Sequence, residues 1–419
     1  MTTIHPLGDL AWLDEAVGDA RVVAIGESAH YNRECYELRH RLLRHLVERH
    51  GFTAYAMESG FVEGRRVDDR VRGGDEPLGR VLAEGMTSLM GLWSPMRATL
   101  EWMREHNRTA ARPVRFWGID LPGSMVSLLP GLDAVLAYLA EADPDFTPDP
   151  AVRAIAAENA APSAFSAPAA LGAFAELPAD RRDALTAGLA DLAARLAALR
   201  LDYVGRTSAE AYARAERAMR VTVTLGALVR AMVRGDMRQA MSQRDAEQAD
   251  TVEWIMAREG RIVLAAHNGH IQRSPGRIGD QPAMTPLGRH LADRLGAAYL
   301  PIGTTTGTGQ VINTGPDFYD GVLFTELAPP PPGTLDAAMA ARGGAPFAVD
   351  LRRLSPGDPL LTVTEQRGGD GKTPTHLTPA EAFDVLIHLP QVTAAEPDAE
   401  AVAASPEDVR KAFTHWMHT

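Results

Sequence analysis

Carboxylate and imidazole side chains follow several apolar runs of the sequence at the points where those runs end. These residues are Glu27, His30, Glu58, Asp120, His267 and His270. An imidazole titrates near neutral pH, and a neighbouring carboxylate fixes its tautomer and stabilises its protonated form. A pocket that brings these groups together can activate water by general base catalysis.

Two rival chemistries use the same residue types. Clusters of His and carboxylate also hold zinc or manganese, but the chain has neither an HExxH nor a CxxC motif. The segment GESAH at 26–30 resembles the GxSxG turn that presents a nucleophilic serine, here Ser28. His30, however, stands where that turn needs a small residue. We therefore favour an acid–base site with no metal and no cofactor.

Three further charged residues have alternative roles. Arg39 lies nine residues after His30 on a predicted helix, where it either holds Glu58 ionised, neutralises an oxyanion or makes a surface salt bridge. Arg244 and Asp245 either form an ion pair that caps a helix or make a wall of the pocket. The sequence pattern leaves these alternatives open.

The apolar runs predict the strands that position these residues. They are rich in Val, Ile and aromatic residues and alternate with helical patterns, which predicts an α/β fold with a mostly parallel sheet. The five clear strands are predicted at 21–26, 52–57, 114–119, 261–266 and 297–303, with further candidates at 321–327, 347–351, 361–365 and 383–389. Ligands bind at the carboxyl ends of the strands in such sheets, so the polar residues are expected to meet at one edge.

The segment between the third and fourth strands is far longer than a crossover needs. Its Ala, Leu and Arg recur with helical periodicity, which predicts a large helical insertion. Long helices are expected at 180–199 and 207–258, the second broken near Gly226 or Gly235.

The remaining segments complete the predicted organisation. We expect a loop with a short helix at 143–170, a surface connector in APPPPG at 328–333 and a helix at the end of the chain. The predicted parts are 1–125, the first part of the α/β core, 126–258, the helical insertion, and 259–419, the second part of the core with the C-terminal segment.

Composition narrows the class of partner. The 419 residues include 42 Lys and Arg against 54 Asp and Glu, a formal net charge of −12. Nucleic acid and anionic membranes require clustered cations, so we expect a small-molecule substrate and neither of these partners. The single Cys35 cannot form an internal disulfide and is expected in the core. With no signal-peptide pattern and no membrane-spanning stretch, the predicted location is the cytoplasm.

Five blocks of the sequence together resemble the erythromycin esterase family. They are GESAH at 26–30, ECYELRHRLLRHLVERHGFTAYAMES at 34–59, FWGID at 116–120, SQRDAEQADTVEWI at 242–255 and VLAAHNGHIQR at 263–273. Their order and spacing match the family over roughly residues 20–310.

The resemblance implies a three-layer α/β core, a deep cleft that the helical insertion lines, and hydrolysis of a macrolide lactone without a required metal. It implies that His30 is the base that activates water. The catalytic residues expected from it are His30, Glu27, Glu58, Arg39, His267 and His270. The residues expected at the substrate are Tyr31, Asp120, Arg244, Asp245 and Asn268.

The chain departs from the family pattern beside the expected base. Ser28 and Ala29 precede His30, and Tyr31 replaces the usual glycine after it. We expect the phenol to narrow the cleft and to add a hydrogen-bond donor, which counts against a large macrolactone. Two alternatives to hydrolysis remain open: an enzyme of natural-product biosynthesis that forms or opens a ring with the same His30 and Glu27, and a ligand-binding protein without catalysis.

Overall fold

The Val- and Ile-rich runs form the centre of a mixed β-sheet. The computed structural model describes residues 4–279 and 282–418, and within them nine strands form this sheet, in the order β1-β9-β12-β7-β2-β5-β3-β4 with β8 paired to β7. The strands are β1 (His5–Pro6), β2 (Val22–Ile25), β3 (Ala54–Gly60), β4 (Arg115–Asp120), β5 (Ile262–Ala265), β7 (Tyr299–Ile312), β8 (Phe324–Leu327), β9 (Phe347–Asp350) and β12 (Val385–Val392). All five clear strand predictions are therefore confirmed.

The sheet is parallel from β12 to its edge strand β4, and antiparallel where β9, β1 and β8 join it. Neighbours from β12 through β7, β2, β5 and β3 to β4 run parallel, whereas β1, β8 and β9 pair antiparallel. The parallel strands bring their carboxyl ends to one edge, which is where the polar residues of the sequence lie. The α/β class with a mostly parallel sheet is confirmed.

Helices cover both faces of the sheet, because side chains alternate between faces along each strand. Val23 and Ile25 of β2 pack in one buried cluster, and Val22 and Ala24 pack in the other. The first cluster includes residues of α1 (Ala11–Val17), α2 (Arg33–His50), α3 (Gly64–Val71), α4 (Leu78–Gly85), α5 (Ser94–Asn107), α17 (Ala399–Ala404) and α18 (Glu407–His418). The second includes residues of α6 (Leu129–Ala142), α7 (Pro150–Glu158), α8 (Ala167–Glu176), α9 (Ala179–Ala198), α10 (Arg200–Arg206), α11 (Ala209–Val233), α12 (Met237–Glu259), α13 (Asn268–Ile271), α14 (Leu287–Leu295), α15 (Leu335–Ala340) and α16 (Pro379–Ala382).

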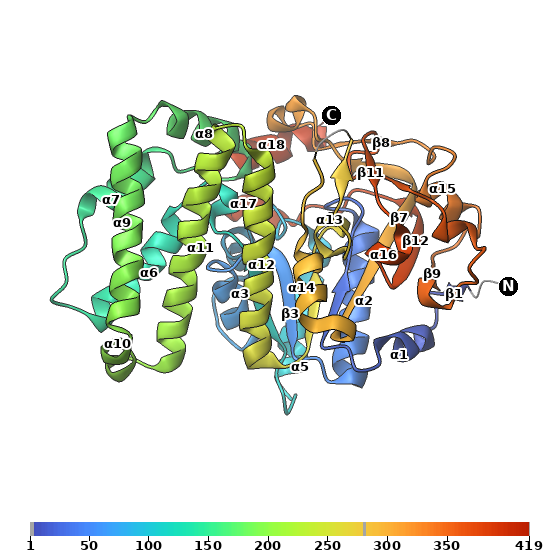
Figure 1. The fold of residues 1–419 in the computed structure, drawn as a ribbon, viewed down its shortest axis with the longest axis horizontal. Helices are drawn as coiled ribbons and strands as arrows, with labels where there is room; N and C mark the ends of the chain where they lie inside the picture. Colours follow the sequence, from blue (N-terminus) through green and yellow to red (C-terminus); the bar gives the residue numbers. More distant parts are fainter. Residues whose placement is uncertain (1–3, 280–281, 419) are drawn as a thin grey trace.

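The helices between β4 and β5 form a group beside the sheet. Figure 1 shows α6 to α11 on one side of the molecule, with α12 between them and the strands. The expected break in the second long helix occurs at Gly235, whose φ of 78° suits glycine, and not at Gly226, which lies inside α11. The segment 143–170 is more helical than predicted, because it contains α7 and the start of α8.

The strand prediction at 361–365 is wrong. A short 3₁₀ helix, Pro359–Leu361, occupies its start, and the Asp358 side chain accepts a hydrogen bond from the backbone N–H of Leu360 there. Such local side-chain bonds compete with strand pairing. Only Glu365 of the predicted stretch lies in a strand. That strand belongs to a second, three-stranded sheet of β10 (Glu365–Arg367), β11 (Pro374–His376) and β6 (Arg277–Ile278).

Two other features match their predictions. Cys35 is buried in the core, and the C-terminal α18 buries Val409, Ala412 and Phe413 against the first cluster. Among the helices that the structure describes, none combines the length and apolar character needed to cross a membrane.

Candidate active site

Glu27, His30 and Arg39 form a hydrogen-bonded group just beyond the carboxyl end of β2. The Nδ1 atom of His30 lies 2.6 Å from Oε1 of Glu27, and Nη1 of Arg39 lies 2.8 Å from Oε2 of the same carboxylate. Glu27 and Arg39 are almost fully buried, while the His30 side chain is 26% exposed. Because Glu27 occupies Nδ1, His30 has Nε2 available to take a proton from a bound water.

Arg39 is fixed by more than its ion pair. It lies on the buried face of α2, where its guanidinium also donates to the carbonyl oxygens of Ile25 at 3.3 Å and Ala266 at 2.6 Å. These contacts exclude one of the alternatives for this residue, the surface salt bridge, because Arg39 is buried. Arg39 contacts Glu27 instead of holding Glu58, it is not a surface salt bridge, and its donors are engaged by protein acceptors.

The pKa values of this group follow from its partners. Burial disfavours the charged form of Glu27, but the positive charge of Arg39 and the hydrogen bond to His30 outweigh it and hold the pKa of Glu27 below its ordinary value. Burial likewise disfavours the imidazolium of His30. The bond to Glu27 and its charge outweigh that effect, so the pKa of His30 lies above its ordinary value.

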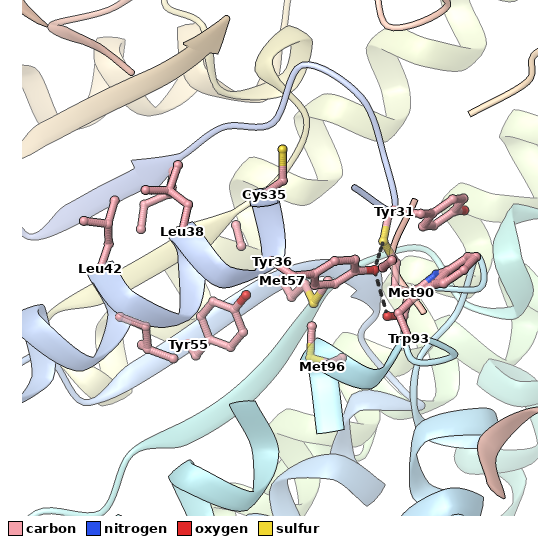
Figure 2. Packing of buried hydrophobic residues seen from close by; sticks show 14 of the residues in the cluster. Tyr31, Cys35, Tyr36, Leu38, Leu42, Tyr55, Met57, Met90, Trp93 and Met96 are labelled. Carbon is pink, nitrogen blue, oxygen red and sulfur yellow. Dashed lines mark hydrogen bonds between the residues drawn. The ribbon is translucent and has the colours of Figure 1, made fainter. Parts of the chain in front are cut away.

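Tyr31 corrects one expectation from the sequence. Its hydroxyl donates to the carbonyl oxygen of Ser88 at 2.6 Å, and its ring stacks on Trp93 with a centroid distance of 5.3 Å. Figure 2 shows the two rings side by side in the core. The phenol is buried with its donor engaged, so it does not supply a hydrogen bond to the cleft. Its backbone φ of 66° makes the sharp turn between His30 and α2.

A second buried group is centred on Arg244 of α12. Its guanidinium lies 2.5 Å from Oδ2 of Asp120 and 2.8 Å from Oε1 of Glu58, at the carboxyl ends of β4 and β3. His270 is part of the same group, since its Nε2 lies 3.2 Å from Oε1 of Glu58 and its Nδ1 lies 2.7 Å from Oδ1 of Asp245. Arg244 and Asp245 therefore belong to the wall of the pocket, one of the two roles that the sequence left open.

Carboxylates outweigh the repulsion between the two cations of this second group, Arg244 and His270, whose Nη1 and Nε2 atoms lie 3.1 Å apart. Burial disfavours the charged form of His270, but the carboxylates of Asp245 and Glu58 outweigh it and raise the pKa of His270 to about 10. Burial also disfavours ionised Glu58, and the charges of His270 and Arg244 nevertheless hold the pKa of Glu58 well below its ordinary value. The two carboxylates therefore favour the imidazolium of His270, beside an ionised Glu58.

His267 lies between the two groups and has the opposite character. Its Nδ1 accepts the backbone N–H of Gly269 at 3.1 Å, which places the proton on Nε2, 3.2 Å from the carbonyl oxygen of Ser28. Burial and the charge of His30 lower the pKa of His267 to about 4. Its ring centroid lies 5.3 Å from that of His30. A neutral imidazole thus stands beside the candidate base.

Asn268 holds the ends of two strands in register. Its side-chain amide donates to the carbonyl oxygen of Thr304 at 2.7 Å and accepts the backbone N–H of the same residue at 3.0 Å. The bonds tie the end of β5 to β7, so the amide has a structural role in addition to any contact with substrate. Gly26 permits this arrangement, because a Cβ atom there would lie 2.1 Å from Oδ1 of Asn268.

A cavity of about 200 Å³ adjoins His267 and the second group, and among the residues that the structure describes neither His30 nor Glu27 is part of its lining. Its walls include Ser28, His267, His270 and the pair Arg244 and Asp245. The helices between β4 and β5 contribute residues of α12 to this wall. A larger cavity of about 480 Å³ lies elsewhere, between β4 and the helices α6 and α11. Its lining combines the aromatic residues Phe61, Trp117 and Tyr138 with charged residues such as Arg65 and Glu141, and none of the described residues that line it is a histidine.

The sequence missed one wall of the cavity. Gln366 and Arg367 of β10, and Gly368 and Gly369 in the turn that follows it, line the cavity next to Ser28 and His267. Gly369 fits closely, since a Cβ atom there would lie 3.0 Å from the carbonyl oxygen of Ser28. The two adjacent glycines are the local sequence feature that indicates close backbone packing here. They do not indicate which part of the chain packs against them.

Comparisons with known proteins agree on one family. The family model for erythromycin esterase matches residues 47–392. Erythromycin esterase type II from Escherichia coli is 29% identical over 364 residues, which are 83% of this chain and 84% of that protein.

Two solved structures share the fold. A Bacillus cereus protein superimposes with a TM-score of 0.77 at 19% identity, over 94% of this chain and 96% of that one. A mutant of the erythromycin esterase EreC in its open conformation gives a TM-score of 0.76 at 21% identity, over 93% and 95% of the two chains. The chain therefore belongs to the erythromycin esterase family, which makes it an ester hydrolase.

Proposed function

We propose that this enzyme hydrolyses a lactone or ester by general base catalysis, with His30 as the base and without a metal. The observation that carries the proposal is the 2.6 Å contact between Nδ1 of His30 and Glu27. It leaves Nε2 of a partly exposed imidazole as the proton acceptor. Arg39 supports this assignment because it fixes the carboxylate that orients the ring.

The proposed reaction has two steps. In the first, Nε2 of His30 takes a proton from water while the water oxygen bonds to the carbonyl carbon, which gives a tetrahedral oxyanion. In the second, the oxyanion re-forms the carbonyl, the bond to the alcohol oxygen breaks, and His30 returns the proton to that oxygen. Glu27 stabilises the imidazolium between the two steps, as a carboxylate does in hydrolytic triads.

The oxyanion needs donors other than Arg39. Its guanidinium is engaged by Glu27 and two carbonyl oxygens, so we withdraw it from the role of oxyanion partner. His267 and His270 both line the cavity. We assign the oxyanion stabilisation to this pair. His267 would exchange its 3.2 Å contact with the carbonyl oxygen of Ser28 for a hydrogen bond from Nε2–H to the oxyanion, and His270, whose ring nitrogens contact Asp245 and Glu58, would act through its positive charge.

The substrate class is inferred from the relatives and from the cavity. Relatives named erythromycin esterases favour a lactone or ester as the substrate. The cavity of about 200 Å³ is smaller than typical drug-sized pockets, which begin at roughly 300 Å³. Its lining includes His267 and His270 but not His30, so the reacting ester group would have to lie at the edge of this cavity nearest His267, whose ring centroid is 5.3 Å from that of His30. We therefore propose that a substrate as large as a macrolide would extend beyond this cavity, and that smaller lactones and esters are the first to test.

Product mass tests the proposal directly. Chelator-treated wild-type enzyme and His30→Ala are each incubated with macrolides, simple lactones and esters, and the products are analysed by mass spectrometry. We expect wild type alone to add one water to a member of the panel. His40→Ala is the matched control, because His40 lies on the same helix but contacts Thr99 instead of Glu27.

Three results would contradict the proposal. An unchanged rate in folded His30→Ala would show that His30 is not the base. Activity that disappears with the chelator and returns with added metal would show that the mechanism requires a metal. A product without added water would replace hydrolysis by ring chemistry.

A further inference from the structure

Three side chains with metal-binding atoms converge at the end of α2 away from the candidate active site. They are Asp14 of α1 and His45 and His50 of α2, and one ligand atom of each lies within 4.8 Å of the other two. Nε2 of His45 and Nε2 of His50 each lie 2.6 Å from the same oxygen, Oδ1 of Asp14. Their rings are 5.7 Å apart, which leaves room for a shared ligand between them.

The fold holds these three residues in place from both helices. α1 buries Trp12 and Leu13 in the same cluster as the apolar face of α2, so Asp14 is presented to the last turns of α2. The backbone carbonyl of His50 accepts a hydrogen bond from Arg261 at 2.7 Å. Gly51 then ends the helix in the left-handed conformation. The backbone at the end of α2 and the position of α1 beside it are therefore fixed by these contacts.

The donor set suits a divalent transition metal. Two imidazole nitrogens and one carboxylate oxygen are three ligands of the kind that bind Zn²⁺, with water completing a tetrahedron. The carboxyl end of a helix carries partial negative charge, which favours a cation there. Arg49 opposes this, since its Nε lies 3.8 Å from Oδ2 of Asp14, but its side chain is 65% exposed and can turn into solvent.

The cluster is separate from the reaction site. His45 and His50 lie in the last turns of α2, and Asp14 lies on the neighbouring α1. Glu27 and His30 precede α2, and Arg39 lies in its first half. Arg261, which holds the His50 carbonyl, directly precedes β5, at the amino end of the sheet. Figure 1 places α1 at the lower end of α2, away from α13, whose N-cap is His267.

We propose that Asp14, His45 and His50 form a Zn²⁺ site that joins α1 to the end of α2. Without the ion, both imidazoles carry a proton on Nε2 and donate to the carboxylate. With the ion bound, both Nε2 atoms bind the metal and each remaining proton is on Nδ1. The site stabilises the packing of α1 on the core and takes no part in the hydrolytic step.

Zinc binding to the tag-free, chelator-stripped full chain tests the proposal. We expect one equivalent of Zn²⁺ in equilibrium dialysis and a higher unfolding temperature with added Zn²⁺, since a ligand that binds the folded state stabilises it. Both effects should be lost in His45→Gln/His50→Gln. His40→Gln, on the same helix, and His267→Gln, in the active site, should keep both.

A measurement on the wild type covers the case in which the double variant does not fold. With ¹⁵N-labelled imidazoles, Zn²⁺ should shift the Nε2 signals of two histidines. One of these signals should be missing in His45→Gln and the other in His50→Gln, which assigns them. The proposal fails if the stripped chain binds no Zn²⁺, if binding survives the double substitution, or if the shifted signals belong to His30, His267 or His270.

Discussion

Glu58 joins the carboxyl ends of two neighbouring strands, because its Oε2 accepts the backbone N–H of His267 at 2.8 Å. Its other oxygen, Oε1, lies 2.8 Å from Arg244 and 3.2 Å from His270. One buried carboxylate therefore positions the backbone that carries the histidine pair and also holds the charge of one member. A change at Glu58 is therefore expected to alter both the position of the His267 backbone and the charge of His270.

Replacing Glu58 by Gln should affect both properties. The amide is uncharged and leaves Arg244 and His270 with less negative charge, so the pKa of His270 should fall. Removing one partner of a buried ion pair costs about 3–5 kcal/mol of unfolding free energy. Urea unfolding, kcat and an NMR titration of His270 measure these effects. Glu37→Gln, at a side chain 61% exposed on α2, is the control; an unchanged His270 titration in Glu58→Gln would contradict the assigned coupling.

Glu27→Gln tests the orientation of the candidate base. The substitution keeps the size of the side chain but removes the charge that stabilises the His30 imidazolium, so kcat should fall by about 10²-fold or more. Substrate binding should change much less, because Glu27 is buried behind His30. Steady-state kinetics separate kcat from KM. A loss confined to KM would show that Glu27 does not act through the base.

The pH dependence of the same pair gives an independent check. His30 must be neutral to accept a proton, so kcat/KM should rise as the pH increases through the pKa of His30. Burial opposes the imidazolium but the bond to Glu27 outweighs it, so this limb should lie above the ordinary pKa of about 6.5. In Glu27→Gln the limb should move to lower pH. If the rise of kcat/KM has the same midpoint in Glu27→Gln as in wild type, the group that titrates is not His30.

Much of the site was predictable because its residues stand directly after apolar runs, and parallel strands bring those positions to one edge. Contacts that depend on packing between distant segments were not predictable. Arg244 contacts Asp120 across 124 positions of sequence, and no local pattern fixes how α12 lies against β4. The direction of Tyr31 depends on a positive φ that is rare outside glycine. The strand predicted at 361–365 does not form, because the Asp358 side chain stabilises a competing local turn.

His270 should make stability fall on the alkaline side of neutrality. Its pKa is raised to about 10 in the folded chain, chiefly because Asp245 and Glu58 outweigh the cost of burial. A group with a raised folded pKa stabilises fully below its unfolded pKa, about 6.5 for histidine, and loses this contribution as the pH rises through the folded pKa. The unfolding free energy of wild type should therefore decline between about pH 6.5 and pH 10.

His270→Gln should be less stable overall but should lose less stability over the same pH interval, while His290→Gln on α14 should keep the wild-type slope. Urea unfolding at a series of pH values measures the three slopes. Parallel curves for wild type and His270→Gln would contradict a raised pKa at this histidine.

Gly26, directly after β2, lies in close contact with the side chain of Asn268. An added Cβ would lie 2.1 Å from Oδ1 of Asn268 and 3.0 Å from Cδ1 of Ile271, and Asn268 cannot move without breaking its two bonds to Thr304. Gly26→Ala should therefore destabilise the chain by about 1–3 kcal/mol, the range for overpacking a core. Gly172→Ala on α8 is the matched control, since no atom lies within 4 Å of its added Cβ. Alanine in that helix should stabilise the chain by roughly 0.5–1 kcal/mol. Urea unfolding of the two variants gives the comparison, and equal stability of Gly26→Ala and wild type would mean that the Asn268 clamp can yield.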